Sequence, residues 1–188
     1  MYTDVQIINL GLAKIGAAKV ATITPPRTSI ERHCADGYAA WRDQEITKRR
    51  WVFSTEHDAS LTLAATFDGR TRPYRYGVPG DALRVIREGN DDWRQSGEWI
   101  DSDDPRLEIT YIRKAPERDF DPLFIDVLAC RIALECVEFT TQSNTKGETA
   151  ERRYNAAVRE AGRMNAFVIG SEPVTDSDEG YDFITHRY

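Results

Sequence analysis

The sequence is poor in the residues that build disulfide frameworks and metal sites, since its 188 residues include three cysteines and three histidines. Cys130 and Cys136 lie in one predicted helix, and six helical steps turn their side chains away from each other. Cys34 is remote from both in the sequence. We predict neither a disulfide nor a zinc site, and we expect the cysteines to be small buried hydrophobic groups.

Long apolar runs are also missing, because no stretch approaches the roughly 20 apolar residues that cross a bilayer. The first residues, Met1-Tyr2-Thr3-Asp4, are polar and lack the basic and apolar regions of a signal peptide. The sequence therefore predicts a chain that folds in a cytoplasm and does not use a membrane.

Motifs for phosphate loops, dinucleotide turns and HExxH zinc sites do not occur in the sequence. His33 and Cys34 are adjacent in a predicted helix, so they point about 100° apart and do not form a nucleophile and its base. Asp101, Asp103 and Asp104 lack the glycine and the final glutamate of a calcium loop, and we expect a solvated turn. We predict no catalytic, cofactor-binding or metal-binding residue, and no enzyme.

Positive charge is in deficit, with a net charge of −6, which argues against tight binding to DNA phosphates. The cations of Lys48-Arg49-Arg50 end a predicted helix. They either touch phosphates or favour the negative pole of that helix.

Helical periodicity is present at both ends of the chain. We predict helices over residues 4–15, 28–50, 121–141 and 148–165. Thr28-x-x-Glu31 is a capping-box pattern that opens the second helix. The third helix is apolar on nearly every side from Leu123 to Phe139, so we expect it to be central or covered by a partner. Within it, Arg131 and Glu135 have the spacing of an ion pair.

Short runs of β-type residues replace this periodicity between the helical regions. Trp93 to Trp99 reads as a hairpin around Ser96-Gly97. From Leu107 to Tyr111, apolar residues alternate with Glu108 and Thr110, which predicts a strand with one wet face. We therefore predict a small antiparallel β module.

The predicted fold is α+β: a four-helix bundle formed by an N-terminal and a C-terminal helix pair, an inserted small antiparallel β module, and an extended C-terminal tail. The predicted boundaries are residues 1–51 and 119–169 for the helix pairs, 52–118 for the β module and 170–188 for the tail. The tail interleaves acidic residues with Tyr181, Phe183, Ile184 and Tyr188, and so many large apolar groups predict docking on a partner.

The order of these motifs resembles one protein family. The resemblance covers about residues 3–166, and its motifs are Ile7-Ile8-Asn9-Leu10-Gly11-Leu12-Ala13-Lys14-Ile15-Gly16 with Val20, Trp51-x-Phe53, Leu61 and Leu63, Tyr74-x-Tyr76-x-x-Pro79-x-Asp81-x-Leu83-Arg84-Val85, Trp93, Trp99-Ile100, Leu107-x-Ile109-x-Tyr111-Ile112, and Asp119-x-Asp121-Pro122-x-Phe124. With its alanine-rich final helices, the chain is similar to the head-to-tail adaptor (connector) proteins of tailed bacteriophages, the family often called tail tubular protein A.

The resemblance implies a structural virion protein that forms a ring, commonly of twelve subunits, under the portal. Such a ring connects the capsid to the tail and forms part of the DNA ejection channel. The implied partners are the portal protein, a tail tube, nozzle or stopper protein, other copies of the chain, and double-stranded DNA that passes without sequence-specific binding. The implied location is the neck of the virion, after assembly in the host cytoplasm. The tail residues Tyr181, Phe183, Ile184 and Tyr188 are the predicted portal or subunit contacts.

Two other interpretations stay open at this point. Some related tail accessory proteins have been credited with cell-wall hydrolysis, and the many carboxylates of this chain are compatible with such an activity. The second alternative is a small soluble ligand-binding module, which would be indifferent to portal protein.

Overall fold

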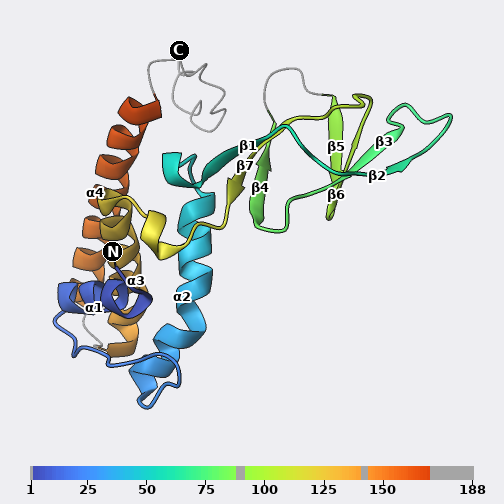
Figure 1. Cartoon of the computed structure of the whole chain (residues 1–188). Coiled ribbons are helices and arrows are strands. Elements are labelled where there is room, and N and C mark those ends of the chain that lie inside the picture. The colour runs from blue at the N-terminus through green and yellow to red at the C-terminus, as the bar shows by residue number, and fades with distance from the viewer. Residues whose placement is uncertain (1, 88–91, 141–143, 170–188) are drawn as a thin grey trace, which may run out of the picture.

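The computed structural model describes residues 2–87, 92–140 and 144–169. In these ranges the chain forms four α-helices, α1 (Asp4–Lys14), α2 (Ser29–Thr47), α3 (Pro122–Thr140) and α4 (Asn144–Ile169), with 3-10 turns η1 (Val52–Ser54) and η2 (Glu117–Asp119). The strands in the same ranges are β1 (Thr55–Asp58), β2 (Leu63–Thr66), β3 (Tyr74–Gly77), β4 (Ala82–Ile86), β5 (Trp93–Ser96), β6 (Trp99–Ser102) and β7 (Ile109–Arg113). The strands lie to one side of the helices (Figure 1).

The helices begin where capping side chains satisfy their first backbone N–H groups. Thr28 and Glu31 form the predicted capping box of α2, with each side chain bonded to the backbone of the other residue. Asp121 Oδ1 accepts a hydrogen bond of 2.7 Å from the backbone N–H of Leu123 at the start of α3. The local sequence signals for these two helix starts are therefore confirmed.

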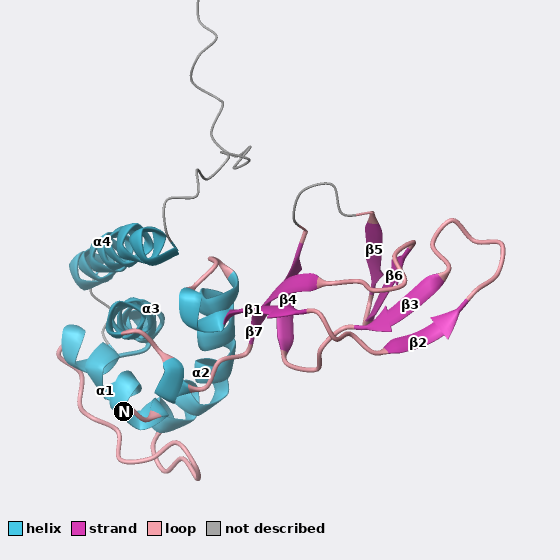
Figure 2. Cartoon of the chain, turned by 45° about the horizontal axis from the view of Figure 1, so that its top comes forward, coloured by secondary structure: helices cyan, strands magenta, loops and turns pink. Residues whose placement is uncertain are grey.

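Helix α3 is the centre of the helical part, with α1, α2 and α4 packed around it (Figure 2). Its residues are buried on several sides, including Phe124, Val127 and Ile132 at 0% exposure. Close approach of α1 depends on Gly11, because a β-carbon there would lie 2.8 Å from the carbonyl oxygen of Ala129. The nearly all-apolar composition of α3 is therefore explained within the chain itself.

The predicted fold class, a four-helix bundle with a small β module, is wrong. The structure is α+β with two antiparallel sheets, one of order β1-β7-β4 and the other of order β2-β3-β6-β5. The helices are also not two pairs, because α1 and α2 each pack mainly on α3 and little on each other. The error arose because each strand has only four or five residues. Such short β-type runs in the sequence do not show how many strands will pair into a sheet.

The prediction of a wet face for the strand near Leu107 is also wrong. β7 lies between β1 and β4, and its residues are buried on both faces. Ile109 and Tyr111 belong to an outer hydrophobic cluster, whereas Ile112 belongs to the helical core. Thr110 is itself 8% exposed. The strand joins two cores, a position that alternation over five residues does not indicate.

The predicted hairpin is confirmed in β5 and β6, where Ser96 pairs with Trp99 and Gly97 adopts a φ of 62°.

Four aromatic rings tie the start of the β part to α3. Trp51 meets Phe124 edge-on at 5.1 Å between centroids, and Phe53 lies 5.5 Å from Phe120 and 4.9 Å from Phe124. These contacts hold η1 firmly against the helical core.

Helix α4 is longer than predicted, since it runs from Asn144 to Ile169 rather than from 148 to 165. Within it, Ala150 and Ala161 are buried, whereas Met164 is 44% exposed. Among the described residues, no helix has both the length and the apolar character needed to cross a bilayer.

Candidate functional site

The last turns of α4 carry apolar side chains that the fold leaves in solvent. We call these residues, with a neighbour from η1, the α4-end patch: Val52, Met164, Phe167, Val168 and Ile169. Phe167 is 78% exposed and Val168 is 68% exposed. An exposed apolar cluster of this kind marks an interaction surface. We therefore take the end of α4 as the candidate functional site.

Asn165 attaches this end of α4 to the segment that follows α2. Its side-chain amide donates to the carbonyl oxygen of Arg50 at 2.7 Å and accepts from the backbone N–H of Val52 at 3.1 Å. Residues 50–52 and 165 are more than a hundred positions apart in the sequence, so this paired contact depends on the tertiary fold. It fixes the position of the patch relative to α2 and η1.

Two grooves run along α4 on either side of Asn165. The first, which we call the η1 groove, has a volume of about 340 Å³. It is lined by Trp51, Val52, Phe53, Asp119, Asp121, Leu123, Ala161, Met164, Asn165 and Val168. Its charged groups are the carboxylates of Asp119, which pairs with Arg113 at 2.9 Å, and Asp121. It is an apolar groove with carboxylates among its lining residues.

The second, which we call the α2 groove, has a volume of about 500 Å³. It is lined by Glu45, Lys48, Arg49, Arg50, Trp51, Val127, Val158, Gly162, Asn165, Ala166 and Ile169. Gly162 makes room for Arg49, because a β-carbon at Gly162 would lie 2.8 Å from Arg49 Nη1. The guanidinium group of Arg49 is thereby laid along α4 at the groove.

A buried charge network lies at one end of the α2 groove. The carboxylate of Glu45 is 2% exposed and accepts hydrogen bonds from Lys48 at 2.6 Å and Arg131 at 3.1 Å. The hydroxyl of Tyr154 lies 3.0 Å from both carboxylate oxygens. Arg131 also forms the predicted pair with Glu135, at 2.6 Å.

The cations of this network keep their charge. Burial lowers the pKa of Lys48, but its hydrogen bonds to Glu45 and Tyr154 outweigh burial and raise that pKa overall. The same balance of burial against Glu135 and Glu45 raises the pKa of Arg131. The charge of Lys48 is therefore offset by Glu45.

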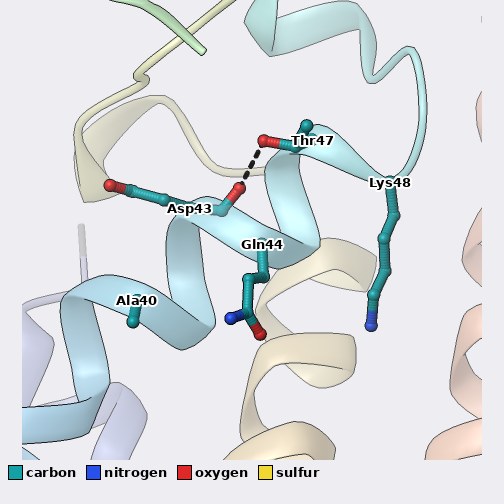
Figure 3. Close-up of a pocket in the computed structure, with 5 residues that line it drawn as sticks. All are labelled: Ala40, Asp43, Gln44, Thr47 and Lys48. Atoms are coloured by element: carbon teal, nitrogen blue, oxygen red, sulfur yellow. Dashed lines mark hydrogen bonds between the residues drawn. The ribbon is translucent and has the colours of Figure 1, made fainter. Parts of the chain in front are cut away.

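A third hollow, on the surface of α2, is drawn in Figure 3. It is lined by Ala40, Asp43, Gln44, Thr47 and Lys48. Thr47 donates to the backbone oxygen of Asp43 at 2.7 Å, and the Asp43 carboxylate pairs with Arg42 at 2.8 Å and Lys114 at 3.3 Å. Its polar groups are engaged within the fold, so we assign it no chemistry.

The cysteines and His33 have local packing roles. Cys34 and Cys136 are buried with their sulfurs 3.9 Å apart, and Cys130 is buried elsewhere on α3, as predicted. The hydrogen bond to Cys34, together with burial, raises the pKa of the Cys136 thiol. His33 stacks on Phe139 at 4.7 Å and does not approach the Cys34 sulfur in a bonded contact among the described residues.

The acidic cluster in the β part is dispersed into separate contacts. Asp101 pairs with Arg75 at 2.6 Å, and this hydrogen bond lowers the pKa of Asp101. Asp104 accepts a hydrogen bond from the backbone of Arg106 at 2.8 Å. Within the described ranges, no group of three or more histidine, cysteine, aspartate or glutamate side chains is placed to hold a metal ion.

The predicted docking residues Tyr181, Phe183, Ile184 and Tyr188 lie outside the described residues. The patch at Phe167 to Ile169 was missed, because we expected α4 to end near residue 165. The apolar run Ala166-Phe167-Val168-Ile169 directly before Gly170 was the available signal.

Comparison with protein-family models gave no match, and comparison with curated proteins gave no significant match.

Proposed function

We propose that this chain is a structural subunit of a phage virion, a head-to-tail adaptor that forms a ring, commonly of twelve copies, between the portal and the tail. The observation that carries the proposal is the α4-end patch. Phe167, Val168 and Ile169 are exposed at the point where the chain continues into the acidic and aromatic residues 171–188. Exposed apolar groups at such a point support docking on another protein.

The shape of the molecule supports two separate contacts. The helical part carries the patch, and the sheets lie on the other side of α2 from α4 (Figure 1). An adaptor must bind one partner toward the capsid and another toward the tail. We assign the α4 end to the portal protein and the β part to a tail tube, nozzle or stopper protein.

The net charge of −6 supports a channel wall that double-stranded DNA passes without sequence-specific binding, since like charges repel the phosphates. The role is structural and needs no substrate turnover. The hydrolase alternative predicts clearing of cell-wall material in a zymogram, and nothing in the described residues favours it.

Electron microscopy of the chain mixed with portal rings of the same phage tests the proposal. We expect additional density on one face of the ring and a fixed subunit ratio by mass photometry. Phe167→Glu should abolish binding, because it places a charge in the patch. Arg152→Glu, an exposed change elsewhere on α4, should bind normally. Unaltered portal rings at micromolar concentrations of the wild-type chain would refute the adaptor role.

A further inference from the structure

Two buried cysteines from different helices lie in contact, and the adaptor role makes no use of them. We propose that Cys34 and Cys136 are an oxidation site, at which a peroxide converts the two thiols into a disulfide that joins α2 to α3. The chemistry concerns side chains of this chain alone and does not depend on the adaptor role.

The first support is proximity. The sulfurs of Cys34 and Cys136 are 3.9 Å apart, although the residues are 102 positions apart in the sequence. Both side chains are at 0% exposure, so the close-packed core keeps them together. To reach the roughly 2 Å of a disulfide bond, each sulfur must move by about 1 Å, which rotation of the two side chains can supply.

The second support is an asymmetry between the two thiols. The hydrogen bond with Cys136 lowers the pKa of the Cys34 thiol, whereas the same bond, together with burial, raises the pKa of the Cys136 thiol. Because the thiolate is the reactive form, Cys34 is the attacking sulfur and Cys136 the resolving one. Cys130 differs from both, since its sulfur lies 3.9 Å from Oδ2 of Asp126 and burial raises its pKa.

The third support is access for a small oxidant. Cys34 lies in the second turn of α2, and Cys136 lies one turn before the end of α3 at Thr140. Next to the pair, His33 stacks on Phe139, and Phe139 is 50% exposed. The thiols are therefore close to the surface and near a helix end, where local opening costs less than global unfolding.

The reaction with hydrogen peroxide takes two steps. The Cys34 thiolate attacks one peroxide oxygen, the O–O bond breaks, and the departing hydroxide takes up the proton lost by Cys34 to become water. Cys34 is then a sulfenic acid. The Cys136 sulfur attacks the sulfenic sulfur, the S–O bond breaks, and hydroxide leaves with the Cys136 proton as a second water. Two thiols are oxidised to one disulfide, and one peroxide is reduced to two waters.

The disulfide clamps the first half of α2. The second half is already held to α3 by the ion pair of Glu45 with Arg131 at 3.1 Å. A link between residues 34 and 136 closes a long loop and so reduces the entropy of the unfolded chain. A virion leaves the reducing cytoplasm of its host, so oxidation would follow ring assembly; this timing, unlike the chemistry, rests on the proposed function.

Treatment of the reduced full-length chain with hydrogen peroxide tests the site. After denaturation and alkylation, mass spectrometry should find one free thiol per oxidised chain in place of three. A tryptic digest without reductant should contain the Cys34 and Cys136 peptides joined to each other. Cleavage after Arg131 separates Cys130 from Cys136, so the digest distinguishes these two residues.

Three matched alanine variants provide the controls, with circular dichroism to check their folds. Cys130→Ala should keep the link, whereas Cys34→Ala and Cys136→Ala should leave both remaining thiols free. Oxidation should raise the melting temperature of the wild type and of Cys130→Ala by about 5–15 °C. A reductant should reverse this rise, and peroxide should not produce it in Cys34→Ala.

Several results would overturn the proposal. One is a peroxide-treated chain without the Cys34–Cys136 peptide, whether its thiols stay free or Cys34 proceeds to sulfinic acid. Another is a link that involves Cys130 or joins two chains, because neither follows from the observed contact. A link that lowers the melting temperature would contradict the clamp. None of these measurements involves portal protein, so failure here leaves the adaptor proposal to its own test.

Discussion

The hydroxyl of Tyr154 on α4 lies 3.0 Å from both carboxylate oxygens of Glu45 on α2, and Glu45 is 2% exposed. This contact joins two helices that otherwise meet mainly through α3. The buried carboxylate of Glu45 at the end of the α2 groove is therefore held by hydrogen bonds from residues of α2, α3 and α4.

Tyr154→Phe should therefore destabilise the chain, because it removes a hydrogen-bond donor from a buried carboxylate. We expect a loss of about 1–3 kcal/mol in the free energy of unfolding, measured by urea denaturation. Tyr2→Phe, which removes a hydroxyl at an exposed position, is the control and should change little. Equal stabilities of Tyr154→Phe and the wild type would show that Lys48 and Arg131 satisfy Glu45 without the tyrosine hydroxyl.

Glu31 makes stability depend on pH in the acid range. Its carboxylate accepts backbone hydrogen bonds from Arg27 and Thr28, which lower its pKa from 4.5 to about 2. Because the folded-state pKa is depressed, this stabilisation is present above pH 4.5 and is lost as the pH falls toward 2.

Glu31→Gln should accordingly lower the melting temperature at pH 7 and have progressively less effect between pH 4.5 and pH 2. Differential scanning calorimetry across this range measures the difference from the wild type. Glu151→Gln, at an exposed position of α4, is the control. A difference that does not change with pH would contradict the assigned role of the Glu31 charge.

Gly11 and Gly147 should respond to alanine in opposite directions. At Gly11 a β-carbon would meet Ala129 and Ile132 at 2.8 Å, so Gly11→Ala should force α1 away from α3 and destabilise by about 1–3 kcal/mol. At Gly147 in α4 nothing lies within 4 Å, and Gly147→Ala should stabilise the helix by up to about 1 kcal/mol. Thermal melts of both variants provide the comparison, and a stabilised Gly11→Ala would rule out the close approach of α1.

Removal of residues 171–188 should abolish binding to portal rings while the truncated chain stays folded. The truncated chain should stay folded because its described core, which includes Trp51, Phe124 and Ile132, is buried by contacts among residues 2–169. Sedimentation with portal rings measures binding, and near-ultraviolet circular dichroism checks the fold. Undiminished binding of the truncated chain would exclude Tyr181, Phe183, Ile184 and Tyr188 as portal contacts.

Local signals in the sequence were sufficient for the start of α2 and for the hairpin of β5 and β6, although its two turn residues are Gly97 and Glu98, one position later than the predicted Ser96-Gly97. Both depend on residues within a few positions of each other, a capping box in one case and a two-residue turn in the other. The joining of short strands into two sheets depends on pairs such as Thr55 with Ile112, which are distant in the sequence. Such pairing leaves no local pattern, which is why the fold class was predicted wrongly.

The candidate site likewise combines a feature that local sequence shows with features that only the fold creates. The apolar run that ends α4 could be read from the sequence. The α2 groove could not, because it forms where residues 45–51 meet residues 158–169. Arg49 illustrates the difference: as one of three cations at a helix end it had a sufficient local explanation, and its position over Gly162 emerged only from the fold.

β7 has one further consequence for the whole molecule. Ile112 is anchored among the helices, while Ile109 and Tyr111 of the same strand are anchored in the outer cluster. A pulling force on the sheets therefore reaches the helices along the backbone of β7, which is packed at both ends. Under tension the helical part and the β part should respond as one mechanical unit rather than as two independent domains.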